Sequence, residues 1–192
     1  MQEGDENMPA PAWLESMLKT QFFASCLHHG AAAKSECNMF CLNCKGDAFC
    51  AYCRSATHVG HQVIQIRRSS YRDVVRVAEI QTALDIKEVQ TYVINSARVL
   101  FLKERPQPKS SKGPGHACKI CGRNLLDSFS FCSLECKLVG IKRECGESLT
   151  PEEELRVRSQ QERFPPPPAT ASPPTSNARR RKGIPRRASF GF

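Results

Sequence analysis

The sequence has few aromatic residues and no long apolar run. Aromatic side chains make up 7% of its 192 residues, with a single tryptophan, so an apolar core alone would be small. No stretch approaches the roughly 18 apolar residues that cross a bilayer, and the polar start, MQEGDENMPAPAW, lacks the apolar segment of a secretory signal. We therefore expect no membrane insertion and a reducing compartment, where clustered cysteines are typically metal ligands rather than disulfides.

Recognisable catalytic motifs are also missing. The sequence has no glycine-rich phosphate loop, no His-Glu-x-x-His and no Gly-x-Ser-x-Gly. The well-spaced cysteines and histidines are all used by the complete metal sites described below, which leaves none for a catalytic zinc ion with an open position. We therefore predict that the protein is not an enzyme and takes no small-molecule substrate.

The positive charge is unevenly spread along the chain. The formal net charge is +9, but residues 1–61 sum to −2. Residues 62–112 contribute +5, residues 113–146 contribute +2, and residues 147–192 contribute +4. A polyanionic partner would therefore meet the middle segment and the C-terminal segment.

Eleven cysteines are the most informative feature of the chain. Residues 26–61 contain four pairs of Cys or His residues, and in each pair two residues lie between the two members. This spacing lets a tight turn direct both side chains at one metal ion, which is typical of zinc sites. The pairs are Cys26 and His29, Cys41 and Cys44, Cys50 and Cys53, and His58 and His61.

Eight ligands suit two tetrahedral zinc ions, and the four pairs can combine in series or crosswise. We favour crosswise pairing because it gives a short segment two crosslinks that support each other. One zinc ion would then be held by Cys26, His29, Cys50 and Cys53, and the other by Cys41, Cys44, His58 and His61. Cys37 could replace Cys26, and His28 could replace His29. In ligand order and pairing this segment resembles a B-box zinc finger.

A second cluster has the spacing Cys118-x2-Cys121-x10-Cys132-x3-Cys136. Four thiolates complete a tetrahedral zinc site without an open position, which indicates a structural role. The total is then three zinc ions. Ser133, within "FCSLEC", is the expected N-cap of a following helix. Cys37 and Cys145 remain as buried small residues or spare thiols.

Sequence patterns predict a small zinc-stabilised α+β fold. An apolar pattern from Trp13 to Phe23 predicts an amphipathic helix leading into the first cluster. "QVIQIRR" and "YRDVVRV" alternate like strands, and "EIQTALD" resembles a short helix. "VQTYVI" and "RVLFLK" predict a hairpin around Asn95-Ser96-Ala97. "TPEEELRVRSQQERF" suggests a short charged helix.

Composition divides the chain into six segments. The cross-braced finger with its leading helix precedes a short β-rich middle segment and the four-cysteine site, and Pro-rich and basic sequence follows. The predicted boundaries are a disordered N-terminus 1–11, the finger 12–61, the middle segment 62–105, a linker 106–117, the four-cysteine site 118–145, and a disordered tail 146–192.

The middle segment and the second cluster closely resemble the PLATZ family of plant AT-rich-sequence and zinc-binding proteins. The stretch "VQTYVINSARVLFLKERPQP", followed by "CKICGRNLLDSFSFCSLECK", carries the resemblance, which covers roughly residues 12–145. It implies a nuclear, zinc-dependent transcription regulator that prefers A/T-rich double-stranded DNA and often represses transcription. The zinc ligands named above carry over because this sequence has each of them, whereas no base-contacting residue does.

Arginines after the first cluster are the candidate DNA contacts, namely Arg67, Arg68, Arg72 and Arg76. Such a group neutralises phosphates, and arginines are attracted into the narrow minor groove of A/T-rich DNA. The alternative is an ordinary solvated strand face, paired with Asp73 and Glu79.

The last fifteen residues carry six positive charges and no acid, on Arg179, Arg180, Arg181, Lys182, Arg186 and Arg187. This run is typical of a nuclear localisation signal or an auxiliary DNA-binding arm, and alternatively of a solubilising tail. "RRAS" would also make Ser189 a substrate for basophilic kinases. The rival function is a B-box-type adaptor that reaches the transcription machinery through protein partners without DNA specificity.

Overall fold

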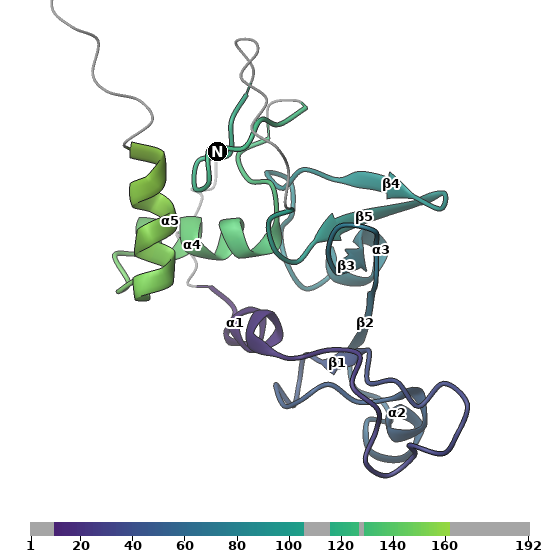
Figure 1. Ribbon diagram of the computed structural model, residues 1–192. Helices are drawn as coiled ribbons and strands as arrows, with labels where there is room; N and C mark the ends of the chain where they lie inside the picture. Colours follow the sequence, from purple (N-terminus) through teal and green to yellow (C-terminus); the bar gives the residue numbers. More distant parts are fainter. Residues whose placement is uncertain (1–9, 106–115, 127–128, 162–192) are drawn as a thin grey trace, which may run out of the picture.

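The computed structural model describes residues 10–105, 116–126 and 129–161. Its short helices and a single antiparallel sheet of short strands confirm the α+β prediction (Figure 1). None of the described helices is long and apolar enough to cross a membrane. In chain order the elements are α1 (Ala12–Lys19), β1 (Met39–Cys41), α2 (Ala51–Thr57), β2 (Val63–Arg67), β3 (Val74–Arg76), α3 (Val77–Ile80), β4 (Tyr92–Ile94), β5 (Ala97–Phe101), α4 (Leu134–Glu144) and α5 (Pro151–Gln161).

The strands form one antiparallel sheet in the order β1-β2-β3-β5-β4. Alternation along β2 shows how the sequence sets its two faces. Ile64 and Ile66 are buried, whereas Val63, Gln65 and Arg67 on the other face are only partly covered. The predicted strands in "QVIQIRR" and "YRDVVRV" are thereby confirmed, although β3 keeps only three residues.

The predicted hairpin is also confirmed, with a shorter turn than expected. Ala97 pairs with Ile94 as the first residue of β5, so the turn consists of Asn95 and Ser96 alone. Both residues have positive φ angles, 48° and 60°. Two left-handed residues give a type I′ turn, whose twist matches the flanking strands.

The helix predicted in "EIQTALD" starts earlier and ends sooner than expected. α3 covers only Val77–Ile80, and the chain then continues in turns held by bonds from the N–H groups of Ala83 and Leu84 to the Ile80 carbonyl. These turns bury Leu84 together with Ile80. The apolar spacing therefore predicted correctly that Ile80 and Leu84 are buried, but it predicted a longer helix than the structure has.

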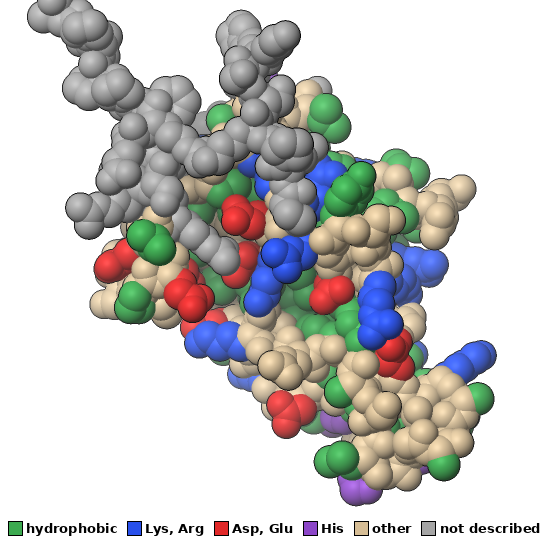
Figure 2. All heavy atoms as spheres, in the orientation of Figure 1, with side chains coloured by type: hydrophobic (Ala, Val, Ile, Leu, Met, Phe, Trp, Pro, Cys, Tyr) green, Lys and Arg blue, Asp and Glu red, His purple; other side chains and the backbone are tan. Residues whose placement is uncertain are grey.

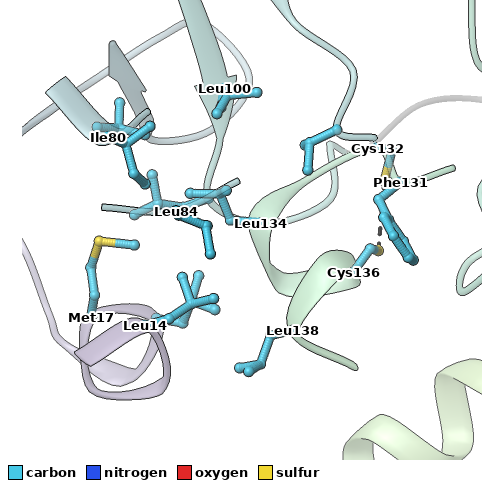
Figure 3. Close-up of a cluster of buried hydrophobic side chains, with 14 of the residues drawn as sticks. Leu14, Met17, Ile80, Leu84, Leu100, Phe131, Cys132, Leu134, Cys136 and Leu138 are labelled. Atoms are coloured by element: carbon cyan, nitrogen blue, oxygen red, sulfur yellow. Dashed lines mark hydrogen bonds between the residues drawn. The ribbon is translucent and has the colours of Figure 1, made fainter. Parts of the chain in front are cut away.

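The main hydrophobic core lies where α1, α3, α4 and one face of the sheet meet (Figure 3). The predicted leading helix is present as α1, but it ends at Lys19. The backbone becomes extended at Thr20, so Phe22 and Phe23 lie beyond the helix. The core residues labelled in Figure 3 are Leu14, Met17, Ile80, Leu84, Leu100, Phe131, Cys132, Leu134, Cys136 and Leu138.

The two C-terminal helices begin at well-formed caps. The Ser133 side chain accepts a hydrogen bond from the Cys136 N–H, which confirms the predicted N-cap of α4. Thr150 and Glu153 bond reciprocally at the start of α5, forming a capping box. The six-segment division stays a prediction, and most of its predicted disordered N-terminus, linker and tail lies outside the described residues. The charged helix predicted in "TPEEELRVRSQQERF" is present as α5 and lies within the segment 146–192 predicted to be disordered.

Candidate functional site

Three groups of Cys and His side chains come together in the structure. In each group the four potential ligand atoms all lie within 4.8 Å of one another. The groups are Cys26, His29, Cys50 and Cys53 (cluster 1), Cys41, Cys44, His58 and His61 (cluster 2), and Cys118, Cys121, Cys132 and Cys136 (cluster 3). The first two follow the crosswise pairing, so each cluster closes a loop that overlaps the other.

The spacing of the side chains within the clusters fits tetrahedral zinc. Zn–S bonds of about 2.3 Å and Zn–N bonds of about 2.0–2.1 Å place two sulfurs about 3.8 Å apart, and a sulfur and a nitrogen about 3.6 Å apart. In cluster 1, Sγ of Cys53 lies 3.7 Å from Sγ of Cys26 and 3.8 Å from Sγ of Cys50. His29 Nδ1 lies 3.5 Å from all three sulfurs.

Cluster 2 and cluster 3 have the same dimensions. Sγ of Cys44 lies 3.6 Å from Nδ1 of His58 and 3.3 Å from Nδ1 of His61. Sγ of Cys132 lies 3.5 Å from that of Cys121 and 3.7 Å from that of Cys136. All three clusters are therefore suited to zinc.

Short turns produce this convergence. The Cys41–Cys44 pair closes with a bond from the Lys45 N–H to the Cys41 carbonyl, and Lys45 has φ 56°. The Cys118–Cys121 pair closes in the same way at Gly122, which has φ 67°. A left-handed residue after the second cysteine turns the chain sharply, so that both sulfurs face the same point.

The thiols of cluster 3 show why such a group needs a cation. Hydrogen bonds from Cys121, Cys132 and Cys136 lower the pKa of the Cys118 thiol. The interaction with Cys118 in turn raises the pKa values of Cys121 and Cys136. Closely packed thiols cannot all ionise alone, and a divalent cation supplies the charge that lets them do so.

The alternative ligands lie outside the clusters. Cys37 is buried beside cluster 1, where burial, followed by the charge of Cys26, raises the pKa of its thiol. His28 is exposed and belongs to none of the three groups, and the same holds for His116. Cys145 is the C-cap of α4.

The clusters differ in how they join the rest of the protein. The main hydrophobic core includes Cys118, Cys132 and Cys136. Figure 3 shows Cys132 and Cys136 among its side chains. Cluster 1 instead belongs to a small separate apolar group, and in cluster 2 both Cys44 and His61 are exposed. The part of the molecule around α2 lies away from α4 and α5 in Figure 1.

The structure divides the four candidate arginines into two pairs. Arg67 is bound to Glu79 at 2.7 Å and to the Gln65 side chain at 2.8 Å. Arg68 lies 2.8 Å from Glu36, with its guanidinium 4.4 Å from the centre of the Phe23 ring. The charges of both are therefore largely balanced by neighbouring carboxylates.

Arg76 is the exposed last residue of β3, and Arg72 is exposed in the loop two residues before that strand. Within the described part of the chain, neither side chain makes an ion pair or a hydrogen bond. On the face drawn in Figure 2, Lys and Arg side chains are concentrated over the middle of the molecule and sparse around α2. The basic surface is thus centred on the strands. The basic residues from Arg179 to Arg187 lie outside the described residues.

Sequence reasoning identified one of these carboxylate partners and missed the other. Glu79 was a candidate because it follows the arginines closely in the chain. Glu36 lies far upstream, between the first two ligand pairs, and reaches Arg68 only in the folded protein. No sequence signal marks such a contact.

The PLATZ transcription factor family model matches residues 67–138. The chain is also similar to the Arabidopsis thaliana protein named RGF1 inducible transcription factor 1. The two are 42% identical over 128 residues, which is 67% of this chain and 49% of that relative. The chain thus spans about half the length of the curated relative it matches. No solved structure matches it. The family model, the relative and the cysteine framework agree, and the chain belongs to the PLATZ family.

Proposed function

We propose that this chain is a nuclear, zinc-dependent regulator of transcription that binds A/T-rich double-stranded DNA and acts as a repressor. Membership of a family described as transcription factors supports the regulatory role and argues against catalysis. The observation that supports the DNA-binding part is the surface formed by β3 and the loop before it, where Arg76 and Arg72 are exposed and unpaired within the described residues.

Zinc would be structural in this function. We assign one ion to each cluster because the sulfur and nitrogen spacings match tetrahedral coordination. Four protein ligands leave no open position for a substrate or an activated water molecule. The ions would crosslink a chain with a small apolar core, and so keep the strands that carry the arginines in place.

A preference for A/T-rich DNA requires little reading of base edges. Narrow A-tract minor grooves have an enhanced negative potential that attracts arginine side chains. Arg72 and Arg76 have the exposure for such insertion. The basic residues from Arg179 to Lys182, with Arg186 and Arg187, would supply nuclear import or further phosphate contacts.

A protein-adaptor function is the second candidate. Leu27 is 99% exposed and Val59 is 74% exposed, and both lie within ligand pairs of the finger. Exposed apolar side chains in a segment whose net charge is −2 (residues 1–61) favour contact with a protein rather than with DNA. The two functions are compatible, because the finger and the basic strands occupy different parts of the molecule (Figure 1).

Binding of the zinc-loaded full chain to A/T-rich and G/C-rich duplexes across a salt series tests the proposal. We expect tighter binding to A/T-rich DNA that persists at physiological salt and is lost when zinc is chelated. Weak binding without sequence preference would refute direct DNA recognition and favour the adaptor. Non-specific binding alone would disappear steeply as salt rises.

A further inference from the structure

The loop between β2 and β3 is a held turn rather than a loose connection. The Ser69 hydroxyl donates to the Arg72 carbonyl at 2.6 Å and accepts from the Arg72 N–H at 3.3 Å. The Ser69 N–H also donates to the Arg72 carbonyl. Tyr71 is 59% exposed and Arg72 is exposed beside it. The turn therefore presents these two side chains to solvent at a fixed position.

Lys103 lies close to this turn, two residues beyond the end of β5. Val74 pairs with Phe101, and the Leu102 N–H bonds to the Asp73 carbonyl at 3.0 Å, which extends the ladder by one pair. Arg72 and Lys103 lie just outside the strands, and the same register extended by one further pair places Lys103 opposite Arg72. Both side chains are exposed, and within the described residues Lys103 makes no ion pair.

Electrostatics support this proximity. Burial raises the pKa of Asp73, and the positive charges of Arg68, Arg72 and Lys103 oppose that rise. All three cations are therefore close to one carboxylate, and among the described residues only Arg68 has an ion-pair partner of its own, Glu36. Asp73 offsets part of the remaining charge, so Arg72 and Lys103 form a cluster with a net positive charge.

Arg105 adds a further positive charge next to this turn. The Arg105 guanidinium lies 4.5 Å from the ring centre of Tyr92, 5.0 Å from that of Phe101 and 5.6 Å from that of Tyr71. It also donates a hydrogen bond to the Tyr92 hydroxyl at 3.3 Å. Contact with three aromatic rings holds a positive charge next to the turn, and in the described part of the chain no carboxylate forms an ion pair with it.

We infer that Arg72 and Lys103 form the principal phosphate-contacting pair of the protein, whereas Arg67 and Arg68 hold the scaffold. The inference rests on the proposed DNA-binding function and adds Lys103, which no sequence motif marks. A phosphate gains little from an arginine that is already balanced by Glu79 or Glu36, because releasing the arginine exposes a repelling carboxylate. Arg72 and Lys103 share only the nearby carboxylate of Asp73, which offsets part of their combined charge, so this cost is smaller for them.

The salt dependence of DNA binding by the zinc-loaded full chain tests the pair. Each phosphate contact contributes about 0.9 to the slope of log K against log salt concentration. The double variant Arg72→Gln/Lys103→Gln should therefore lower the slope by about 1.8. The variant Arg67→Gln/Arg68→Gln should keep the slope while lowering the melting temperature.

A matched control removes two exposed cations elsewhere, in Arg54→Gln/Lys87→Gln. An equal fall of slope in this control, or an unchanged slope in the Arg72/Lys103 variant, would overturn the inference and leave DNA binding intact. Absence of binding by the wild-type chain would instead refute the proposed function and, with it, the inference.

Discussion

Gly140 lies in α4 where Phe131 leaves no room for a side chain. A Cβ atom at residue 140 would be 2.6 Å from two carbons of the Phe131 ring, which is buried. We expect Gly140→Ala to lower the free energy of unfolding by about 1–3 kcal/mol, because overpacking outweighs the higher helix propensity of alanine. Urea denaturation of the zinc-loaded chain measures the change.

Gly46→Ala is the matched control. Nothing lies within 4 Å of a Cβ atom at residue 46, so its stability should stay within about 0.5 kcal/mol of wild type. A Gly140→Ala variant as stable as this control would show that Phe131 moves aside easily, and that the packing of α4 against it is loose.

At the residue scale, local spacing was informative and distant pairing was not. The Cys/His pairs could be recognised from sequence because short spacers limit where paired side chains point, whereas the crosswise grouping of the first four pairs was only the favoured of two alternatives. The division of the four arginines into two paired and two unpaired side chains could not be predicted from sequence. It depends on Glu36, which a bridge between Ser25 and Glu36 places near Arg68 after folding.

At the element scale, one lysine joins three helices. Nζ of Lys142 in α4 lies 3.1 Å from Glu153 of α5 and 3.4 Å from Glu15 of α1, and its side chain is 6% exposed. Burial favours the neutral form of Lys142, but the two carboxylates raise its pKa overall. For Glu153, burial is outweighed by hydrogen bonds from Thr150 and Lys142, which lower the pKa.

We expect Glu153→Gln to detach α5 from α4 at a cost of about 1–3 kcal/mol, because Lys142 loses a charged acceptor. Hydrogen exchange of the α5 amides measures the opening.

The same contact should make the stability of α5 depend on pH. The contribution of Glu153 to this stability is present above its ordinary pKa of 4.5 and is lost as pH falls through the lowered value. The Lys142 contribution is present below 10.5 and is lost as pH rises through the raised value. Protection in wild type should therefore be greatest between these limits.

Glu154→Gln is the control for this prediction, because Glu154 is exposed in the same helical turn. Its exchange should match wild type across the pH range. Equal loss of protection in both variants would mean that net charge at the helix start, rather than the Lys142 contact, holds α5 in place.

Elements whose pattern was local could be predicted, as the β4–β5 hairpin and the Ser133 cap show. The length of α3 could not, because the turns after Ile80 follow from where Leu84 meets the core. β1 was missed because its three residues include a cluster cysteine and have no alternation long enough to detect.

At the scale of the whole molecule, the metal clusters should differ in resistance to chelation. Cluster 2 has two exposed ligands, whereas three cysteines of cluster 3 are within the main core. We expect a chelator to remove zinc from cluster 2 first and from cluster 3 last, with cooperative unfolding only at the last step. Alkylation of cysteines followed by mass spectrometry gives the order.

Cys44 should therefore be alkylated well before Cys118, Cys132 and Cys136. The slow loss of helical circular dichroism should follow the modification of those three rather than that of Cys44. Simultaneous modification of all sites would contradict this order, and would mean that the finger and the core unfold as one unit.

The crosswise pairing also has a consequence for the continuity of the chain. The segment from Lys45 to Ala48 joins Cys44 to Phe49 and lies inside both ligand loops, that of cluster 1 and that of cluster 2. A single peptide-bond cleavage there would separate the first half of each ligand set from its second half. If the pairs were joined in series, the same cleavage would leave both sets whole. Lys45, Gly46 and Asp47 are exposed, so one protease cut in this stretch would break the covalent link between the two halves of both metal sites of the finger at once.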